Sequence, residues 1–322
     1  MIGYSVRRIV HTIPLFLSVL IMMFVLLQLT PGDPIQDLIG SYPVPNAYRQ
    51  TLVQEYHLNQ SVPERFLYYL WNMLHGNLGY SFAGHMSVTD LIMGALPNTL
   101  LLVAVGTVLS MVIGILLGFL PVLLGGRTVD GVVNVGVVTG FAIPTFWFGQ
   151  ILIILFGVRL GWFPVSGMDP LFGGDTGIAG FFQHIQYLVL PVLALSVPAL
   201  ANITRVQQQS ALEVLGNDYI VTAELKGLTA SQILRRHVLR NSLLPVVTVI
   251  GYGFGTAMAG TVLIENVFGW PGIGNLLILS INRRDNQVII GIVMVAAAII
   301  ILTNLVTDLI YGALDPRIRA QS

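Results

Sequence analysis

The stretch from residue 205 to residue 255 joins two contrasting kinds of sequence. It begins with the polar run RVQQQSALEVLGNDYIVTAELKGLTASQILRRHVLRN (205–241) and continues directly into the apolar run SLLPVVTVIGYGFG (242–255). The polar run holds Lys226, the only lysine of the chain, and the arginines Arg235, Arg236 and Arg240. A charged segment that abuts a long apolar one is typical of a chain entering a membrane. It predicts an exposed inner segment between two membrane-spanning helices.

The composition of the whole chain supports a membrane protein. Its 322 residues are 55% hydrophobic and 9% charged, with a mean hydropathy of +0.80, whereas soluble domains carry about 25% charged residues. A net charge of zero gives no indication of nucleic acid binding. The absence of cysteine excludes disulfides, a thiolate nucleophile and a zinc–thiolate site.

Hydropathy predicts an all-α integral membrane protein with six transmembrane helices. The spans lie at about 9–29, 97–125, 132–157, 186–204, 243–264 and 287–311. Each must be helical, because an open sheet edge cannot satisfy its backbone groups in lipid. None contains Lys or Arg, and Asp308 is the only acidic residue within them.

The distribution of Lys and Arg predicts the orientation of the chain. With the N-terminus inside, the inner segments hold ten of the fifteen basic residues and the outer segments hold five. Positive charge favours the cytoplasmic side, so both termini are expected in the cytoplasm. The N-terminal run after Arg8 is longer than the apolar region of a signal peptide and lacks a cleavage site, so we interpret it as a retained first span.

Three regions follow from these spans. Residues 1–30 form the inner N-terminal end and the first span, residues 31–96 an extracytoplasmic region with helices near 46–57 and 63–75, and residues 97–322 the core transmembrane domain. The outer region is either a cap on the spans or a docking surface for an external partner. Residues 158–185 are glycine-rich and are expected to form a loop.

Small residues and prolines within the spans predict close helix contacts and local kinks. The pairs Gly114/Gly118, Gly136/Gly140 and Gly251/Gly255 have helix-packing spacing. They serve either packing within the chain or a seam with a second membrane subunit. Kinks are expected at prolines within or at the ends of spans, namely Pro14, Pro121, Pro144, Pro191 and Pro198.

The segment ENVFGWPGIGNLLILSINRRDN (265–286) is apolar but interrupted by proline and glycine. This pattern breaks a helix and favours a segment that dips toward the membrane or lies over a pore mouth. An ordinary surface loop is the alternative. We expect an outer gating loop whose residues include Glu265, Asn266, Phe268, Trp270, Pro271 and Gly272.

Motifs of enzyme chemistry and energy coupling are missing. Lys226 stands in AELKGLT, without the glycines of a nucleotide-binding P-loop. The chain has no HExxH or GxSxG sequence. Asp308 has no paired carboxylate, which argues against intramembrane proteolysis, and charge-free spans argue against a proton-coupled carrier. We expect no catalytic residue, no metal site and no cofactor in this chain.

The inner segment 205–242 is expected to contain two short helices. Asn217 or Asp218 caps the first, which runs through Lys226 and ends at Gly227. The second starts at Thr229, with Gln232 at the capping-box position.

In the second helix, Ile233, Leu234 and Val238 share one side, and the three arginines lie near its C-terminal end, where cations are favourable. Either the segment rests on the bilayer surface, or the first helix docks an external motor. The candidate docking residues are Asp218, Tyr219, Ala223, Glu224, Gly227 and Leu228.

These residues carry a family resemblance. DYIVTAELKGLTASQILRRHVLRNSLLPVVT (218–248) resembles the cytoplasmic loop of binding-protein-dependent ABC transporter permeases of the dipeptide/oligopeptide/nickel family, in particular their first membrane subunit. Three further motifs agree in order: LTPGDP (29–34), IENVFGWPGIG (264–274) and ALDPRIR (313–319). The loop departs from the general EAAxxxG pattern, because Val221, Thr222 and Ala223 stand at the EAA positions; Glu224 or Asp218 is the acidic substitute.

The resemblance implies a type I importer permease in the bacterial inner membrane. It implies a second permease subunit, two ATP-binding subunits that hold ATP and Mg²⁺, an extracytoplasmic solute-binding protein, and contact with lipid. The implied substrates are peptides, with nickel or a metal–metallophore complex as the alternative. A secondary carrier or channel without ATPases is the alternative of another class, and an intramembrane enzyme is a third.

Overall fold

The computed structural model describes residues 2–29, 45–55, 59–81, 83–170 and 177–314. Most of the LTPGDP motif, Phe82 and most of the ALDPRIR motif lie outside these ranges. The described chain is helical apart from one short hairpin, whose strands β1 (Tyr80–Ser81) and β2 (Met86–Ser87) are antiparallel with Tyr80 opposite Ser87. This confirms the prediction of an all-α membrane protein.

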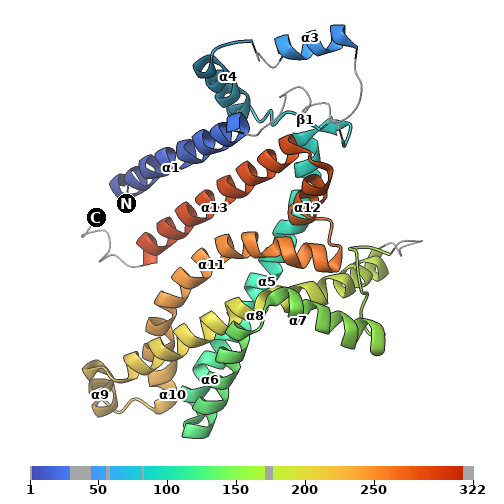
Figure 1. The fold of residues 1–322 in the computed structure, drawn as a ribbon. Helices are drawn as coiled ribbons and strands as arrows, with labels where there is room; N and C mark the ends of the chain where they lie inside the picture. Colours follow the sequence, from blue (N-terminus) through green and yellow to red (C-terminus); the bar gives the residue numbers. More distant parts are fainter. Residues whose placement is uncertain (1, 30–44, 56–58, 82, 171–176, 315–322) are drawn as a thin grey trace.

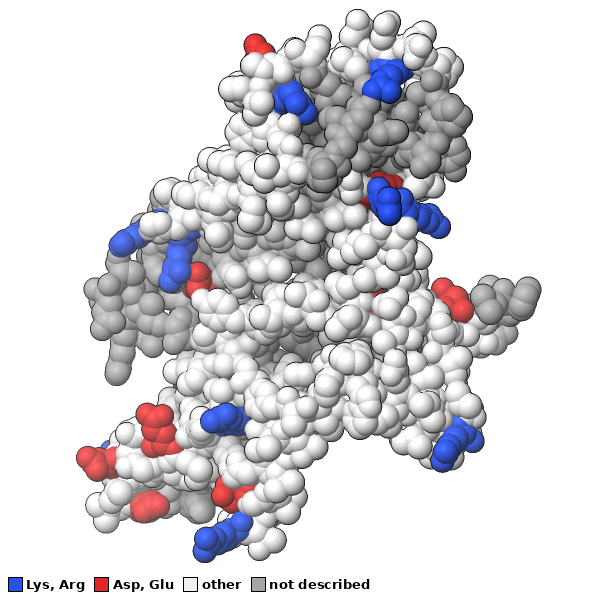
Figure 2. Space-filling view, in the orientation of Figure 1, with Lys and Arg blue, Asp and Glu red and all other residues white. Residues whose placement is uncertain are grey.

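Within the described residues, five helices are long and apolar enough to cross a membrane. They are α1 (Ile2–Leu29), α5 (Val88–Leu124), α8 (Gly177–Leu215), α11 (Leu239–Phe268), which continues from shorter helical turns, and α13 (Asn286–Leu314). In Figure 2 the charged side chains on the visible face lie toward the margins of the molecule, and the surface between them is almost uncharged. An uncharged band is what a hydrocarbon layer requires.

The third predicted span, 132–157, is broken near Pro144, where a kink was expected, and is not one continuous helix. Helix α6 (Arg127–Ala142) is followed by α7 (Thr145–Leu152) and the π-helical turn η1 (Ile153–Arg159), and the two parts meet at an angle of 101°. The break falls at Ile143 and Pro144. Proline cannot donate its backbone nitrogen and disfavours helical geometry in the residue before it, which explains the bend.

Helix α8 lies at the centre and packs against α5, α6, α7 and α11 (Figure 1). Glycines allow this packing: a Cβ atom on Gly118 would collide with the carbonyl oxygen of Thr204, and one on Gly114 would collide with Ile203. Gly140 also faces α8, while Gly251 and Gly255 face α13. Packing within the chain therefore accounts for five of the six paired glycines. Gly136 faces open space.

A peripheral group of helices completes the outer part of the molecule. Helix α1 packs on α13 and contacts α4 (Val62–Leu74), and α3 (Asn46–Glu55) precedes α4. The two helices expected in the outer region are thus confirmed within two residues. The expected loop over 158–185 is only partly correct, because α8 already begins at Gly177.

The inner segment is shorter than the sequence suggested. Residues 205–215 continue α8, and residues from Ala230 onward form one helical stretch through α10 (Ala230–Ile233), the π-helical turn η2 (Leu234–Val238) and α11. Only residues 216–229, which include α9 (Asp218–Leu225), connect them. The prediction that Arg235, Arg236 and Arg240 stand at a helix C-terminus was wrong, because the helix runs on to Phe268.

Candidate translocation pathway

A cavity of about 340 Å³ lies between the central helices. Its walls come from α5, α8 and α11, with Phe141 of α6 and Thr145 of α7 at the bend of the broken span. Because the chain bends between α6 and α7, residues from both helices line the cavity. None of the sixteen lining residues is charged.

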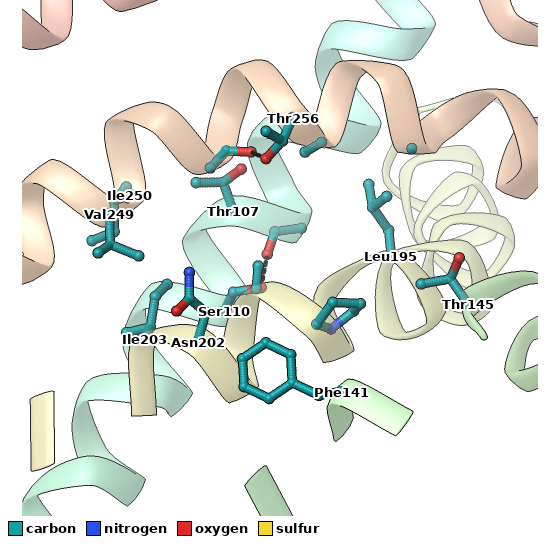
Figure 3. Close-up of a pocket in the computed structure, with 16 residues that line it drawn as sticks. Thr107, Ser110, Phe141, Thr145, Leu195, Asn202, Ile203, Val249, Ile250 and Thr256 are labelled. Atoms are coloured by element: carbon teal, nitrogen blue, oxygen red, sulfur yellow. Dashed lines mark hydrogen bonds between the residues drawn. The ribbon is translucent and has the colours of Figure 1, made fainter. Parts of the chain in front are cut away.

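The polar groups of the cavity are hydroxyls and one amide. Thr107 and Ser110 of α5, Thr256 of α11 and Asn202 of α8 are gathered around it (Figure 3). The Ser110 hydroxyl lies 2.7 Å from the carbonyl oxygen of Gly106 and 3.0 Å from that of Ser196, so it is occupied by the backbone. Asn202 is exposed and keeps both donors and an acceptor for a passing solute. Such a site forms hydrogen bonds without selecting for charge.

Glycines widen the cavity on its α11 side. A Cβ atom on Gly253 or Gly260 would meet no atom within 4 Å, although both residues line the cavity. Gly251, two residues from Gly253, has no such room because a Cβ atom there would collide with Thr307 of α13. One helix therefore uses glycine for two purposes, to contact α13 and to leave open space.

The expected outer gating loop is mostly helical, which corrects the prediction for 265–286. Glu265, Asn266 and Phe268 belong to the last turn of α11, and α12 (Ile273–Arg283) begins after the break at 269–272. Trp270 is fully buried, whereas Pro271 is exposed. Gly269 ends α11 with a φ of 58°, a left-handed conformation that suits glycine.

Hydrogen bonds fasten this turn to the start of the second span. The indole Nε1 of Trp270 donates to the Asn98 carbonyl at 3.0 Å, and the Asn98 side-chain amide donates to the Pro271 carbonyl at 2.8 Å. The backbone N–H of Ile273 donates to the Thr99 hydroxyl at 2.9 Å. Residues at both ends of the turn between α11 and α12 are therefore hydrogen-bonded to α5.

The side chain of Glu265 lies at the centre of these hydrogen bonds and is completely buried. One carboxylate oxygen accepts from the Thr99 hydroxyl at 2.7 Å, and the other accepts from the N–H groups of Gly274 and Asn275 at 2.7 and 3.0 Å. These N–H groups begin α12, where a negative charge is favourable. Gly272 permits the arrangement, because a Cβ atom there would collide with the carboxylate.

Helix α9, in the segment that joins α8 to α10, has both buried and exposed side chains. Ile220 and Ala223 are buried against Phe119, Val214 and neighbouring residues. The Ala223 side chain is therefore not on the exposed surface of α9, where a docking residue is expected. Asp218, Tyr219, Glu224 and Gly227 are exposed and Leu228 is half-buried.

Leu225, which the sequence analysis did not single out, has a side chain that is 85% exposed. Val221, which is also exposed, lies one helical turn before it. This four-residue spacing was the sequence signal that the two side chains share one face of the helix.

The expected end signal of the first inner helix and start signal of the second are present. Gly227 has a φ of 79° and follows the last residues of α9. The N–H of Thr229 donates to the Gln232 side chain at 2.9 Å, and the Thr229 hydroxyl accepts from the Gln232 N–H at 3.4 Å. Ile233 and Val238 are buried on the same side. Asn217 occupies the cap position of α9 without a side-chain capping bond.

Comparison with known proteins decides the family. The family model of the binding-protein-dependent transport system inner membrane component matches residues 110–320. The chain belongs to this family. It is 37% identical over 319 residues to the oligopeptide transport system permease protein AppB of Bacillus subtilis, covering 99% of both chains. It is 36% identical over 336 residues to the dipeptide transport system permease protein DppB of Escherichia coli K12, again covering 99% of both.

Structural comparison supports the same architecture for this inner membrane component. An inward-facing structure of the MetNI methionine ABC transporter matches with a TM-score of 0.52 and 21% identity, over 70% of this chain and 96% of that one. At this identity the match shows the fold alone. The fold is that of a type I ABC importer permease.

Proposed function

We propose that this chain is the first permease subunit of an ATP-driven, binding-protein-dependent importer of di- and oligopeptides. The observation that carries the proposal is the uncharged cavity at the centre of a permease fold, in a chain whose full-length relatives bear the names of peptide permeases. Hydroxyl and amide groups can bind the peptide backbone that all such substrates share. Uncharged walls tolerate side chains of either sign.

The proposal places energy coupling on other subunits. Two cytoplasmic ATPases hold ATP and Mg²⁺, a second permease closes the pathway, and an extracytoplasmic binding protein delivers the peptide. Exposed residues of α9, with Leu225 at their centre, form the contact with one ATPase. Both termini lie in the cytoplasm, and the turn 269–272 with α12 lies at the outer mouth, where it gates the pathway.

Asp308 has a structural role that argues against a proton-coupled carrier. It accepts a hydrogen bond from the Arg8 guanidinium at 2.8 Å and lies within 3.4 Å of the Tyr252 hydroxyl. Both carboxylate oxygens of Asp308 are thus engaged in contacts within the chain.

Reconstitution tests the proposal directly. The complete transporter in proteoliposomes is expected to accumulate labelled dipeptides only with ATP and the binding protein. Leu225→Asp is expected to leave ATP hydrolysis measurable but to reduce uptake at least tenfold. Leu212→Asp, at an exposed leucine of the polar extension of α8 outside the predicted spans, is the control and should retain uptake. Peptide uptake that persists without the ATPases would contradict the proposal.

A further inference from the structure

Helix α4 carries two apolar faces, although only one of them packs on the protein. Its inner face holds Tyr69, Leu70 and Met73, which pack against a cluster formed by residues of α1 and α13. Phe66 and Tyr69 also contact Phe24 of α1, with ring centroids 5.2 and 5.6 Å away. This face explains why α4 is fixed to the membrane-spanning helices.

The outer face of α4 is a stripe of three large apolar side chains. Leu67, Trp71 and Leu74 have helical spacing and are 63%, 61% and 64% exposed. The ring of Trp71 lies 4.1 Å from that of His75 and leaves most of the indole uncovered. Three such residues on one short helix are costly to leave in water, at about 1.5–3 kcal/mol for each large apolar side chain. The stripe therefore needs a partner.

The position of α4 indicates what that partner is. Figure 1 shows α4 at the end of α1 opposite its N-terminus and directed across the α1 axis, so it extends along the plane that α1 crosses. At the same end, Val25 and Leu29 of α1 are 45% and 71% exposed, as expected for side chains that face lipid. Exposed apolar side chains are thus present both at this end of the span and on α4.

We propose that α4 is an interfacial helix that inserts Leu67, Trp71 and Leu74 into the outer leaflet of the bilayer. Tryptophan is enriched at this depth, and amphipathic helices lie there with their apolar face about 5–10 Å below the headgroups. The ionisable residues Glu64, Arg65 and His75 stand at the two ends of α4, so the middle of the stripe is free of charge. The inference rests on the proposed orientation, with both termini in the cytoplasm, but not on the peptide substrate.

The cysteine-free sequence allows a clean test. Single cysteines replace Leu67, Trp71 or Leu74 in the complete transporter and carry a nitroxide label in phosphatidylcholine–phosphatidylglycerol vesicles. Collisions with oxygen, which concentrates in lipid, are compared with collisions with a water-soluble nickel chelate. We expect oxygen to dominate several-fold at all three positions. Thr51, exposed on the polar helix α3, is the control and should favour the chelate.

Two outcomes would overturn the inference. One is chelate access at Leu67, Trp71 and Leu74 equal to that at Thr51, which would place α4 in water. The other is loss of chelate access only when the purified solute-binding protein is added, which would assign the stripe to that protein. Peptide uptake is measured on the same vesicles, so a failure of the transport proposal is seen separately from the labelling result.

Discussion

At the scale of single residues, glycine has opposite roles at two neighbouring positions of α11. Gly251→Ala is expected to destabilise the protein by about 1–3 kcal/mol, because the new methyl group collides with Thr307. Gly253→Ala is expected to be neutral or slightly stabilising, because its methyl group enters open space and alanine favours the helix by about 1 kcal/mol. Thermal unfolding of the purified variants measures the difference. Equal melting temperatures would contradict the assigned packing.

Gly253 also allows a test of whether the cavity is the path that the substrate takes. Gly253→Leu is expected to insert correctly, because nothing lies within 4 Å of its Cβ atom, but to fill part of the cavity of about 340 Å³. Peptide uptake should fall at least fivefold, while Gly253→Ala retains most of it. Gly136→Leu, at an equally open position away from the cavity, controls for the added bulk. Normal uptake by Gly253→Leu would move the pathway elsewhere.

Glu265 provides a second test at this scale. Glu265→Gln keeps the shape and can turn its one oxygen to the N–H groups of α12, but its NH₂ group then faces the Thr99 hydroxyl, which loses its acceptor. A buried polar group left without its partner costs about 1–3 kcal/mol. We expect faster hydrogen exchange of residues 270–276 by mass spectrometry. Thr99→Val should give part of the effect, because it removes the other contact.

The sequence predicted residues whose roles are local and missed those that depend on distant partners. The capping roles of Gly227 and of Thr229 with Gln232 follow from neighbours in the chain, and they are confirmed. The burial of Glu265 depends on Thr99, which is 166 positions away. Ala223 was named as a candidate docking residue because neither its size nor its position shows whether it packs inward or stays exposed. Only the packing against Phe119 distinguishes these alternatives.

At the scale of elements, α4 offers a prediction about pH. The Glu64 carboxylate accepts hydrogen bonds from the Ser61 hydroxyl and N–H at 2.8 and 3.0 Å, and these bonds lower the pKa of Glu64 below its ordinary value of 4.5. The cap is therefore complete above pH 4.5 and is lost as the pH falls through the lower, folded-state pKa. Hydrogen exchange of residues 61–68 should rise below pH 4.5 relative to Glu64→Gln. A constant ratio across this range would show that the cap does not contribute.

The lengths of elements were predicted less well than their existence. Apolar windows locate spans, but a helix that continues into water, as α8 does through Leu215, gives no hydropathy signal at the membrane boundary. The kink at Pro144 was predicted from the proline, although its angle of 101° was not, because the angle depends on how α7 packs against α8 and α11. The turn at 269–272 was found, but α12 after it was not recognised as a helix.

At the scale of the whole molecule, one ion pair joins the two ends of the chain. Arg8 of α1 and Asp308 of α13 are 300 positions apart and lie 2.8 Å from each other, with Tyr252 of α11 beside them. Asp308→Asn is expected to lower the melting temperature by a few degrees, since a partly exposed pair contributes about 1 kcal/mol. The exchanged pair Arg8→Asp with Asp308→Arg should recover part of the loss. No recovery would mean that Asp308 acts through other contacts.

The overall architecture followed from the sequence because membranes leave few alternatives. Charge-free runs of about 20 residues must be helices, and four separated motifs narrowed the family. The arrangement around α8 did not follow, since glycine spacing alone does not show which helix is the neighbour. Gly114 and Gly118 meet α8, whereas Gly251 and Gly255 meet α13.

The hydrogen bonds around Glu265 bear on where a solute can pass. The part of α5 at Asn98 and Thr99, the end of α11 and the start of α12 share one set of hydrogen bonds around a buried tryptophan, so we expect them to move together. Within the described residues, these bonds make the three segments a single block. An opening for a solute is therefore expected along the edge of this block rather than between its members.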